Sequence, residues 1–334
     1  MNIKQAILAA AVPAALAMTG QANAFVYGGA GMNVDNLVVS IFDSTGALAT
    51  IGNFDFRTTT ASDLNGVLGP NDIDSCGGTV SANTCGGPGA ALVLNSNPSS
   101  IGIVRPDNTF TFLGPGGGQF GSSDNVIWDA ALVGDADTHA QGIAEAELTT
   151  GTSAGATSTI RSTTGFTFNF TVGASGTFIL EFDADPDLYA ELIDLSASGG
   201  TASSSISTNF RITGASGTNI SWAPMGLAGD QCLEFGGPAV CSEIADTANL
   251  NASVTAPFGS FDQNSWEPLT TTNFTHFGIM ITGLTAGNYS FTLETTQEAN
   301  VTRTARVPEP ASLALLGIGL AGLGAAARRR NRAK

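Results

Sequence analysis

Apolar and polar side chains alternate without a break in Phe166-Thr167-Phe168-Asn169-Phe170-Thr171-Val172. Successive side chains of a strand point to opposite faces of a sheet, so this pattern predicts a strand with one buried face. A second run, Thr177–Phe182, follows after Gly173-Ala174-Ser175-Gly176, and the pair predicts a β-hairpin. The centre of the chain is therefore expected to be antiparallel β-structure.

Short strand patterns separated by turn signals recur on both sides of this stretch. Further strands are predicted at 37–42, 91–94, 101–104, 109–113, 126–132, 209–213, 219–222, 250–254, 273–281, 289–294 and 301–306. One helix is predicted, over Thr138–Leu148, where Ile143 and Leu148 stand among alanines. About a dozen short strands with little helical pattern favour an all-β fold, an antiparallel β-sandwich of jelly-roll or immunoglobulin-like type.

Residues 1–24 have the pattern of a secretory signal peptide. Lys4 precedes the apolar stretch Ala6–Met18, and Ala22-Asn23-Ala24 provides a small-x-small cleavage site before Phe25. A buried N-terminal helix is the alternative, but the flanks of the apolar stretch are those of a signal peptide. The chain is therefore expected to be exported.

Residues 307–334 form a tail with three parts in a fixed order. A rigid, extended tetrapeptide containing two prolines comes first. Residues 311–327 are uncharged and apolar, enough for about 25 Å of transmembrane helix. A basic cluster follows, which stays on the cytoplasmic side of a membrane. The residues expected to form the sorting signal are Val307, Pro308, Glu309, Pro310, Arg328, Arg329 and Arg330.

This tail resembles the PEP-CTERM class of exosortase substrates of Gram-negative bacteria. The resemblance covers about the last 28 residues and implies that an exosortase, a sorting transpeptidase, recognises Pro308-Glu309-Pro310. It further implies that the helix and the arginines hold the chain in the inner membrane before processing. The protein would then reach the cell surface or the extracellular space. An ordinary C-terminal membrane anchor is the alternative, which explains the helix and the arginines but not the tetrapeptide.

The body between these signals, residues 25–306, is strongly acidic. It contains six arginines, no lysine and 27 of the 28 acidic residues. Such a surface repels nucleic acid and anionic lipid, so no nucleic-acid partner is expected. The Ser/Thr-rich segment 149–164 is either a linker between two subdomains, about 25–150 and 160–306, or a long loop in a single sandwich. A single sandwich is favoured.

Four cysteines fall in two pairs of equal spacing. Eight residues separate Cys76 from Cys85, and eight separate Cys232 from Cys241. An even number of cysteines in an exported protein predicts disulfides, and the spacing favours one local bridge within each pair. A zinc site made of all four is the alternative, but paired zinc ligands usually have about two to four residues between them.

The densest acidic cluster is Asp183-Ala184-Asp185-Pro186-Asp187. Calcium is bound by several converging oxygens, so Asp183, Asp185 and Asp187 are candidate calcium ligands. The position where an EF-hand needs glycine is Leu188, so such a site would be of another kind. The alternative is a solvated acidic turn, of which 71–74 and 135–137 are further examples. No other cofactor is expected.

Other motifs do not support catalysis. Gly151-Thr152-Ser153-Ala154-Gly155 fits the nucleophile-elbow pattern but lacks a buried strand before it, and the chain has two histidines, His139 and His276. His276 is expected to be structural or partly exposed, on the strand face opposite Phe277. The tryptophans, expected in the core or on a sheet surface and not in a binding face, are Trp128, Trp222 and Trp266.

Together these features predict an exported, non-catalytic protein of the cell surface or extracellular matrix, associated with exopolysaccharide. Its partners would be the exosortase, the inner membrane before processing and the exopolysaccharide. The alternative is a secreted carbohydrate-binding protein or a hydrolase that acts on a surface polymer. The spacing of the acidic residues singles out no acid–base pair, so no enzyme class is supported.

Overall fold

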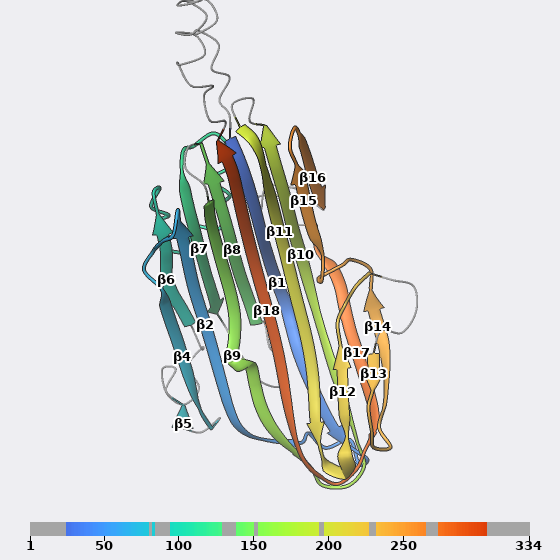
Figure 1. The fold of residues 1–334 in the computed structure, drawn as a ribbon. Helices are drawn as coiled ribbons and strands as arrows, with labels where there is room; N and C mark the ends of the chain where they lie inside the picture. The colour runs from blue at the N-terminus through green and yellow to red at the C-terminus, as the bar shows by residue number, and fades with distance from the viewer. Residues whose placement is uncertain are drawn as a thin grey trace, which may run out of the picture.

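The computed structural model describes residues 25–79, 82–83, 94–128, 138–149, 153–193, 197–226, 232–264 and 273–305. These residues form two antiparallel sheets packed as a β-sandwich, so the all-β prediction is confirmed (Figure 1). Residues 1–24 and the tail 307–334, including the predicted helix 311–327, lie outside the described residues. None of the described segments is a helix long and apolar enough to cross a membrane.

The first sheet has the strand order β14-β17-β10-β1-β8-β7-β6, and β16 also pairs with β10. Its strands are β1 (Phe25–Asp43), β6 (Leu94–Ile101), β7 (Phe120–Trp128), β8 (Thr138–Leu148), β10 (Gly176–Ile193), β14 (Val240–Asp246), β16 (Ser260–Asn264) and β17 (Thr275–Leu284).

The second sheet has the order β13-β12-β11-β18-β9-β2-β4-β5, with β15 on β11 and β3 on β2. Its strands are β2 (Thr50–Leu64), β3 (Val67–Leu68), β4 (Asp72–Thr79), β5 (Ala82–Asn83), β9 (Ser153–Val172), β11 (Ala197–Gly214), β12 (Asn219–Trp222), β13 (Cys232–Glu234), β15 (Ser253–Pro257) and β18 (Gly287–Ala305). A single 3-10 turn, η1 (Ala215–Gly217), joins β11 to β12.

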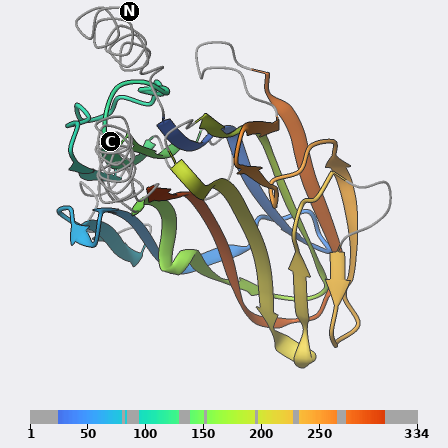
Figure 2. The same cartoon turned by 45° about the horizontal axis from the view of Figure 1, so that its top comes forward.

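The two sheets draw their strands from the whole length of the body. In the first sheet β1 pairs with both β8 and β10, and in the second β9 pairs with both β2 and β18. Strand β9 begins at Ser153, inside the segment considered above as a linker. Figure 2 shows the two layers, with β11 and β18 in one and β1 in the other. In each sheet the strands from before residue 150 and those from after it form two neighbouring groups, which pair through β1 and β10 in the first sheet and through β2 and β9 in the second.

The hairpin predicted around Gly173-Ala174-Ser175-Gly176 is wrong. The two runs are strands, but β9 belongs to the second sheet and β10 to the first. Phe170 and Phe178 face each other across the interior, with ring centroids 5.8 Å apart. The apolar side chains of both strands point into the same core from opposite sheets. The turn at residues 173–176 therefore connects the two sheets. The second Gly-Ala-Ser-Gly turn does join paired strands, β11 and β12.

Aromatic rings from the two sheets fill the centre of the sandwich. Phe291 of β18 lies 4.7 Å from Phe168, 5.0 Å from Phe210 and 5.4 Å from Phe178, measured between ring centroids. Phe178 comes from the first sheet and the other three rings from the second. Aromatic side chains bury a large apolar area each, so this cluster is a main source of hydrophobic stabilisation.

The helix predicted over Thr138–Leu148 is wrong, because this segment is strand β8. It pairs with β1 on one side and β7 on the other, so neighbouring strands satisfy its backbone groups. Ala144, Ala146 and Leu148 face the core, while Glu145 and Glu147 lie on the outward face and are also fully buried. Tertiary pairing has overridden the helical preference of the alanines. The predicted strand 109–113 is wrong as well, because it lies in the irregular connection between β6 and β7.

The acidic turn expected at 71–74 is wrong, because residues 72–74 begin strand β4, where two aspartates contact the edge of the first sheet. Asn95 N–H donates to Asp74 Oδ2 (3.0 Å), and Asn97 N–H donates to Asp72 Oδ2 (2.6 Å). These carboxylates of β4 therefore satisfy backbone donors of the edge strand β6. Unpaired edge groups can template aggregation, and the two aspartates protect this edge.

Candidate functional site

A buried ion pair anchors the connection 102–119 to the outward face of the first sheet. Arg105 is 2% exposed and forms an ion pair with Glu145 of β8. Its guanidinium also donates to Ser122 Oγ (3.0 Å) and to the carbonyl oxygens of Thr109 (2.6 Å) and Thr111 (3.0 Å). Burial lowers the pKa of Arg105 to about 10, so the side chain is charged at neutral pH.

Two buried glutamates of β8 hold the glycine-rich end of the same connection. Glu145 accepts hydrogen bonds from Tyr27 Oη (2.7 Å), Leu113 N (3.1 Å) and Gly114 N (3.2 Å). Glu147 accepts from the N–H groups of residues 116 and 117, at 3.0 and 3.1 Å. Burial raises the pKa of Glu147, which these backbone donors partly offset. The acids therefore fix the path of the loop, and with it the residues that the loop presents.

A surface hollow of about 350 Å³, broadly open to solvent, lies between the anchored connection and the strands beneath it. Val126 and Trp128 come from β7, and the loop covers part of the same face. We call this feature the amide–aromatic hollow, and its lining residues are Asn95, Asn108, Phe110, Val126, Trp128 and Gln141. Trp128 is half-buried on the surface of the first sheet, one of the two places expected for it, and there it also lines the hollow.

Trp128 is held in place by a neighbour on β8. The His139 ring stacks on the indole, with centroids 5.2 Å apart and an angle of 10° between the planes. His139 Nδ1 in turn lies 2.6 Å from Asp35 Oδ1 of β1. The stack and the contact with Asp35 restrict the rotamers of both rings, so the aromatic wall of the hollow is preorganised.

Asp124 lies beside the hollow on β7, next but one to Val126. Its side chain is buried, and Thr109 N–H donates to its Oδ2 (3.3 Å). Burial raises the pKa of Asp124 to about 7, against the effect of the hydrogen bonds and of Arg105.

This shift predicts a stability that falls as the pH rises from about 4 to about 7. Between these values the folded state retains a proton on Asp124 that the unfolded state has lost, so stability falls across this range and levels off above about pH 7. Asp124→Asn should remove this component, whose slope is at most about 1.4 kcal/mol per pH unit. Urea unfolding at pH 5 and pH 8 tests it, and an equal pH dependence in both proteins would contradict it.

The predicted calcium ligands lie in one row on the outward face of β10. Asp183 accepts a hydrogen bond from Asn36 Nδ2 (2.9 Å) and lies 2.9 Å from His276 Nδ1. Asp185 accepts from Asn273 N–H (3.2 Å), and Asp187 is 1% exposed. Alternate strand positions are about 7 Å apart, which separates the outer two carboxylates by about 13 Å. Within the described part of the chain no three acidic, histidine or cysteine side chains are grouped for a metal. Calcium binding stays a prediction.

His276 is half exposed, and Phe277 is fully buried on the opposite face, as the sequence predicts. The imidazole lies between two acids of β10, with Nε2 3.4 Å from Glu181 Oε1. The hydrogen bond with Asp183 is the main cause of a raised pKa of His276.

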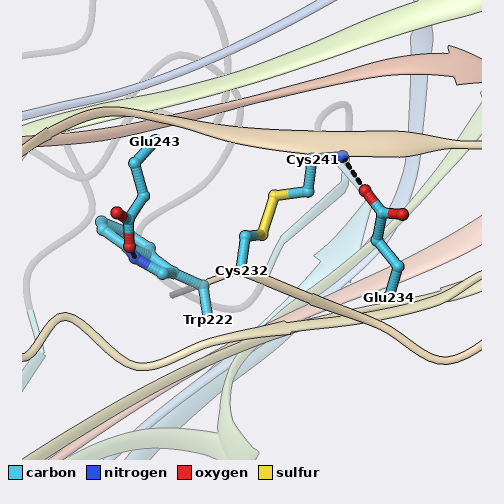
Figure 3. Close-up of a disulfide and its surroundings, with 5 residues drawn as sticks. All are labelled: Trp222, Cys232, Glu234, Cys241 and Glu243. Atoms are coloured by element: carbon cyan, nitrogen blue, oxygen red, sulfur yellow. Dashed lines mark hydrogen bonds between the residues drawn. A yellow bond between two sulfur atoms is a disulfide. The ribbon is translucent and has the colours of Figure 1, made fainter. Parts of the chain in front are cut away.

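The predicted disulfide between Cys232 and Cys241 is present, with a Cα–Cα distance of 5.9 Å (Figure 3). It joins β13 of the second sheet to β14 of the first, at the edge of the sandwich. Two hydrogen bonds accompany it, from Trp222 Nε1 to Glu243 Oε1 (2.8 Å) and from Cys241 N–H to Glu234 Oε1 (2.6 Å). A bridge that looks local in the sequence therefore fastens one sheet to the other.

Of the second predicted pair of cysteines, the structure describes Cys76 alone. Cys76 of β4 is disulfide-bonded and 7% exposed, while Cys85 lies outside the described residues. Trp266 also lies outside them, and Trp222 is buried in the core.

Replacing Cys232 and Cys241 with serine should lower the free energy of unfolding by about 2–3 kcal/mol. The bridge closes a short loop, and its loss raises the entropy of the unfolded chain. Urea unfolding of the double variant measures the change. Wild-type protein treated with a reductant is the matched comparison, and an unchanged midpoint in both would contradict the prediction.

The sorting residues Val307, Pro308, Glu309, Pro310, Arg328, Arg329 and Arg330 lie outside the described residues. The comparisons with known proteins concern this region. A family model of the PEP-CTERM protein-sorting motif matches residues 306–330, which confirms the resemblance of the tail. No curated protein and no solved structure matches the chain.

Proposed function

We propose that this chain, which carries the PEP-CTERM sorting motif of exosortase substrates, is a non-catalytic protein of the cell surface or extracellular matrix. The observation that carries the proposal is the match at residues 306–330, which indicates export and sorting. In this proposal the exosortase recognises the tail while residues 311–327 anchor the chain in the inner membrane. The processed body then associates with exopolysaccharide outside the cell.

Two properties of the body support a location outside the cytoplasm. The disulfide between Cys232 and Cys241 needs an oxidising compartment to form and persist. The large excess of acidic residues keeps the body soluble and away from nucleic acid.

Replacing Pro308-Glu309-Pro310 with three alanines tests the sorting function. The variant should stay in the inner membrane with its C-terminal tail uncleaved, while the unaltered chain reaches the surface or medium with a smaller mass. Cell fractionation and mass spectrometry measure both properties. Ser312→Ala, a change in the adjacent apolar segment, is the matched control and should be sorted normally. Unchanged location and mass of the triple-alanine variant would refute the proposal.

A second candidate function is recognition of a surface carbohydrate, which the amide–aromatic hollow favours over hydrolysis. A glycoside hydrolase generally places two carboxyl groups about 5–9.5 Å apart across the scissile bond. Among the residues that the structure describes, six line the hollow, and they supply amides, aromatic rings and a valine but no carboxylate. Binding is therefore the better supported reading of this hollow.

A further inference from the structure

We propose that the amide–aromatic hollow is a binding site for one neutral pyranose unit of a saccharide, stacked on Trp128. The inference rests on the second proposed function, carbohydrate recognition, and adds the site and the ligand class. It does not depend on sorting by the tail, because the site is built wholly from the body.

The size of the hollow suits a small ligand. Its volume of about 350 Å³ lies at the lower end of the range found for small-molecule sites, roughly 300–1,000 Å³. The buried pair Arg105–Glu145 and the glycine amides on Glu147 fix the covering loop. The hollow is therefore preformed, and little ordering entropy is lost when a ligand binds.

The aromatic side chains favour a flat ligand with apolar C–H groups on one face. The negative face of an aromatic ring attracts such groups, and a pyranose ring presents them on a face while its hydroxyls point outward. His139 stacks on Trp128 and is itself held by Asp35, which keeps the indole in one orientation. Phe110 adds a second aromatic ring from the loop.

Three amide side chains supply both donors and acceptors, which is what vicinal hydroxyls need. Within the described residues, the side-chain amides of Asn108 and Gln141 form no hydrogen bond. Asn95 Nδ2 donates to the carboxylate of Asp107, at 3.1 and 3.2 Å, while its Oδ1 is shielded from solvent and has no partner among the described residues. A buried acceptor without a partner destabilises the free protein, and a ligand hydroxyl could donate to it after a small rotation of the amide.

The charges around the hollow select a neutral ligand. Asp107 accepts a hydrogen bond from Asn95, Asp124 lies on the strand beside Val126, and the guanidinium of Arg105 is buried in its ion pair with Glu145. The body as a whole carries six arginines against 27 acidic residues. An anionic sugar such as a uronate would therefore be repelled, and the described lining has no cation to offset the charge of its carboxylate.

Calorimetric titration of the purified body with neutral gluco-, manno- and galacto-oligosaccharides, and with oligogalacturonate, tests the site. We expect one of the neutral series to bind and the oligogalacturonate not to bind. Trp128→Ala should weaken binding about tenfold or more, since it removes the stacking surface. Asn108→Gly should weaken it about threefold to tenfold. Asn108 has a left-handed φ of 54°, so glycine keeps the backbone while removing the amide.

Phe261→Ala is the matched control, because it removes an exposed aromatic ring of β16 that does not line the hollow. It should bind the neutral oligosaccharide like the unaltered body. Binding that is unchanged in both Trp128→Ala and Asn108→Gly would overturn the site while leaving carbohydrate recognition standing. Absence of binding by the unaltered body would overturn carbohydrate recognition itself, and tighter binding of oligogalacturonate would overturn the neutral ligand class.

Discussion

Glu145→Gln is expected to lower the free energy of unfolding by about 3–5 kcal/mol, because it leaves the guanidinium of Arg105 buried without its counter-charge. Glu145 and Arg105 are both fully shielded, so solvent cannot compensate for the lost partner. The carboxylate also accepts hydrogen bonds from Tyr27 and from the loop amides at Leu113 and Gly114, and an amide can satisfy fewer of these donors. Urea unfolding followed by circular dichroism measures the change.

The double variant Arg105→Met/Glu145→Gln separates the charge effect from packing. Its loss of stability should be smaller than the sum of the two single losses, since it leaves no unpaired buried charge. Ser100→Ala on β6 is the control: it removes a hydroxyl that accepts a hydrogen bond from the backbone N–H of Arg105 (3.1 Å) but removes no charge, so it should cost much less. Additive losses in the double variant would show that the two side chains do not act as a pair.

Phe291→Ala is expected to lower the free energy of unfolding by about 3–5 kcal/mol, the usual cost of removing a fully buried aromatic ring. The ring is fully buried and lies within 5.4 Å of three other aromatic rings, measured between centroids. One of these rings, Phe178, belongs to the opposite sheet, so the cavity would open in the contact that holds the sheets together. Thermal and urea unfolding provide the measurement.

Two further substitutions make this prediction specific. Phe291→Leu fills most of the space and should cost less than Phe291→Ala. Phe261→Ala removes a ring that is 62% exposed, and its effect should stay within about 0.5 kcal/mol. A similar loss for Phe261→Ala and Phe291→Ala would contradict a core centred on the aromatic cluster.

The strand content was predictable because the alternation is strong. Phe166–Val172 and Thr177–Phe182 are both strands, and Cys232 does bond with Cys241, as their spacing predicts. The pairing of these strands within the sheets could not be predicted from the alternation. A short turn between two alternating runs suits either a hairpin or a crossing between sheets. Whether residues 173–176 form a hairpin or cross between the sheets depends on which face of each strand becomes buried.

The candidate binding site could not be found from the sequence. Asn95, Phe110, Trp128 and Gln141 come from four separate segments and show no common spacing. Trp128 looks isolated until β7 and β8 pair and place His139 against it. The acidic residues were equally ambiguous, since Asp74 caps an edge strand and Glu145 neutralises a buried arginine.

The sequence by itself was sufficient to identify the sorting motif of this protein and to predict its fold class. The tail motif at 306–330 is contained in one short stretch of sequence, and the alternating patterns are local consequences of strand geometry. The tertiary structure alone decided which strands pair, why 138–148 is a strand and not a helix, and where the hollow lies. These features depend on long-range backbone pairing and on burial, which bring together side chains that no short window of sequence contains.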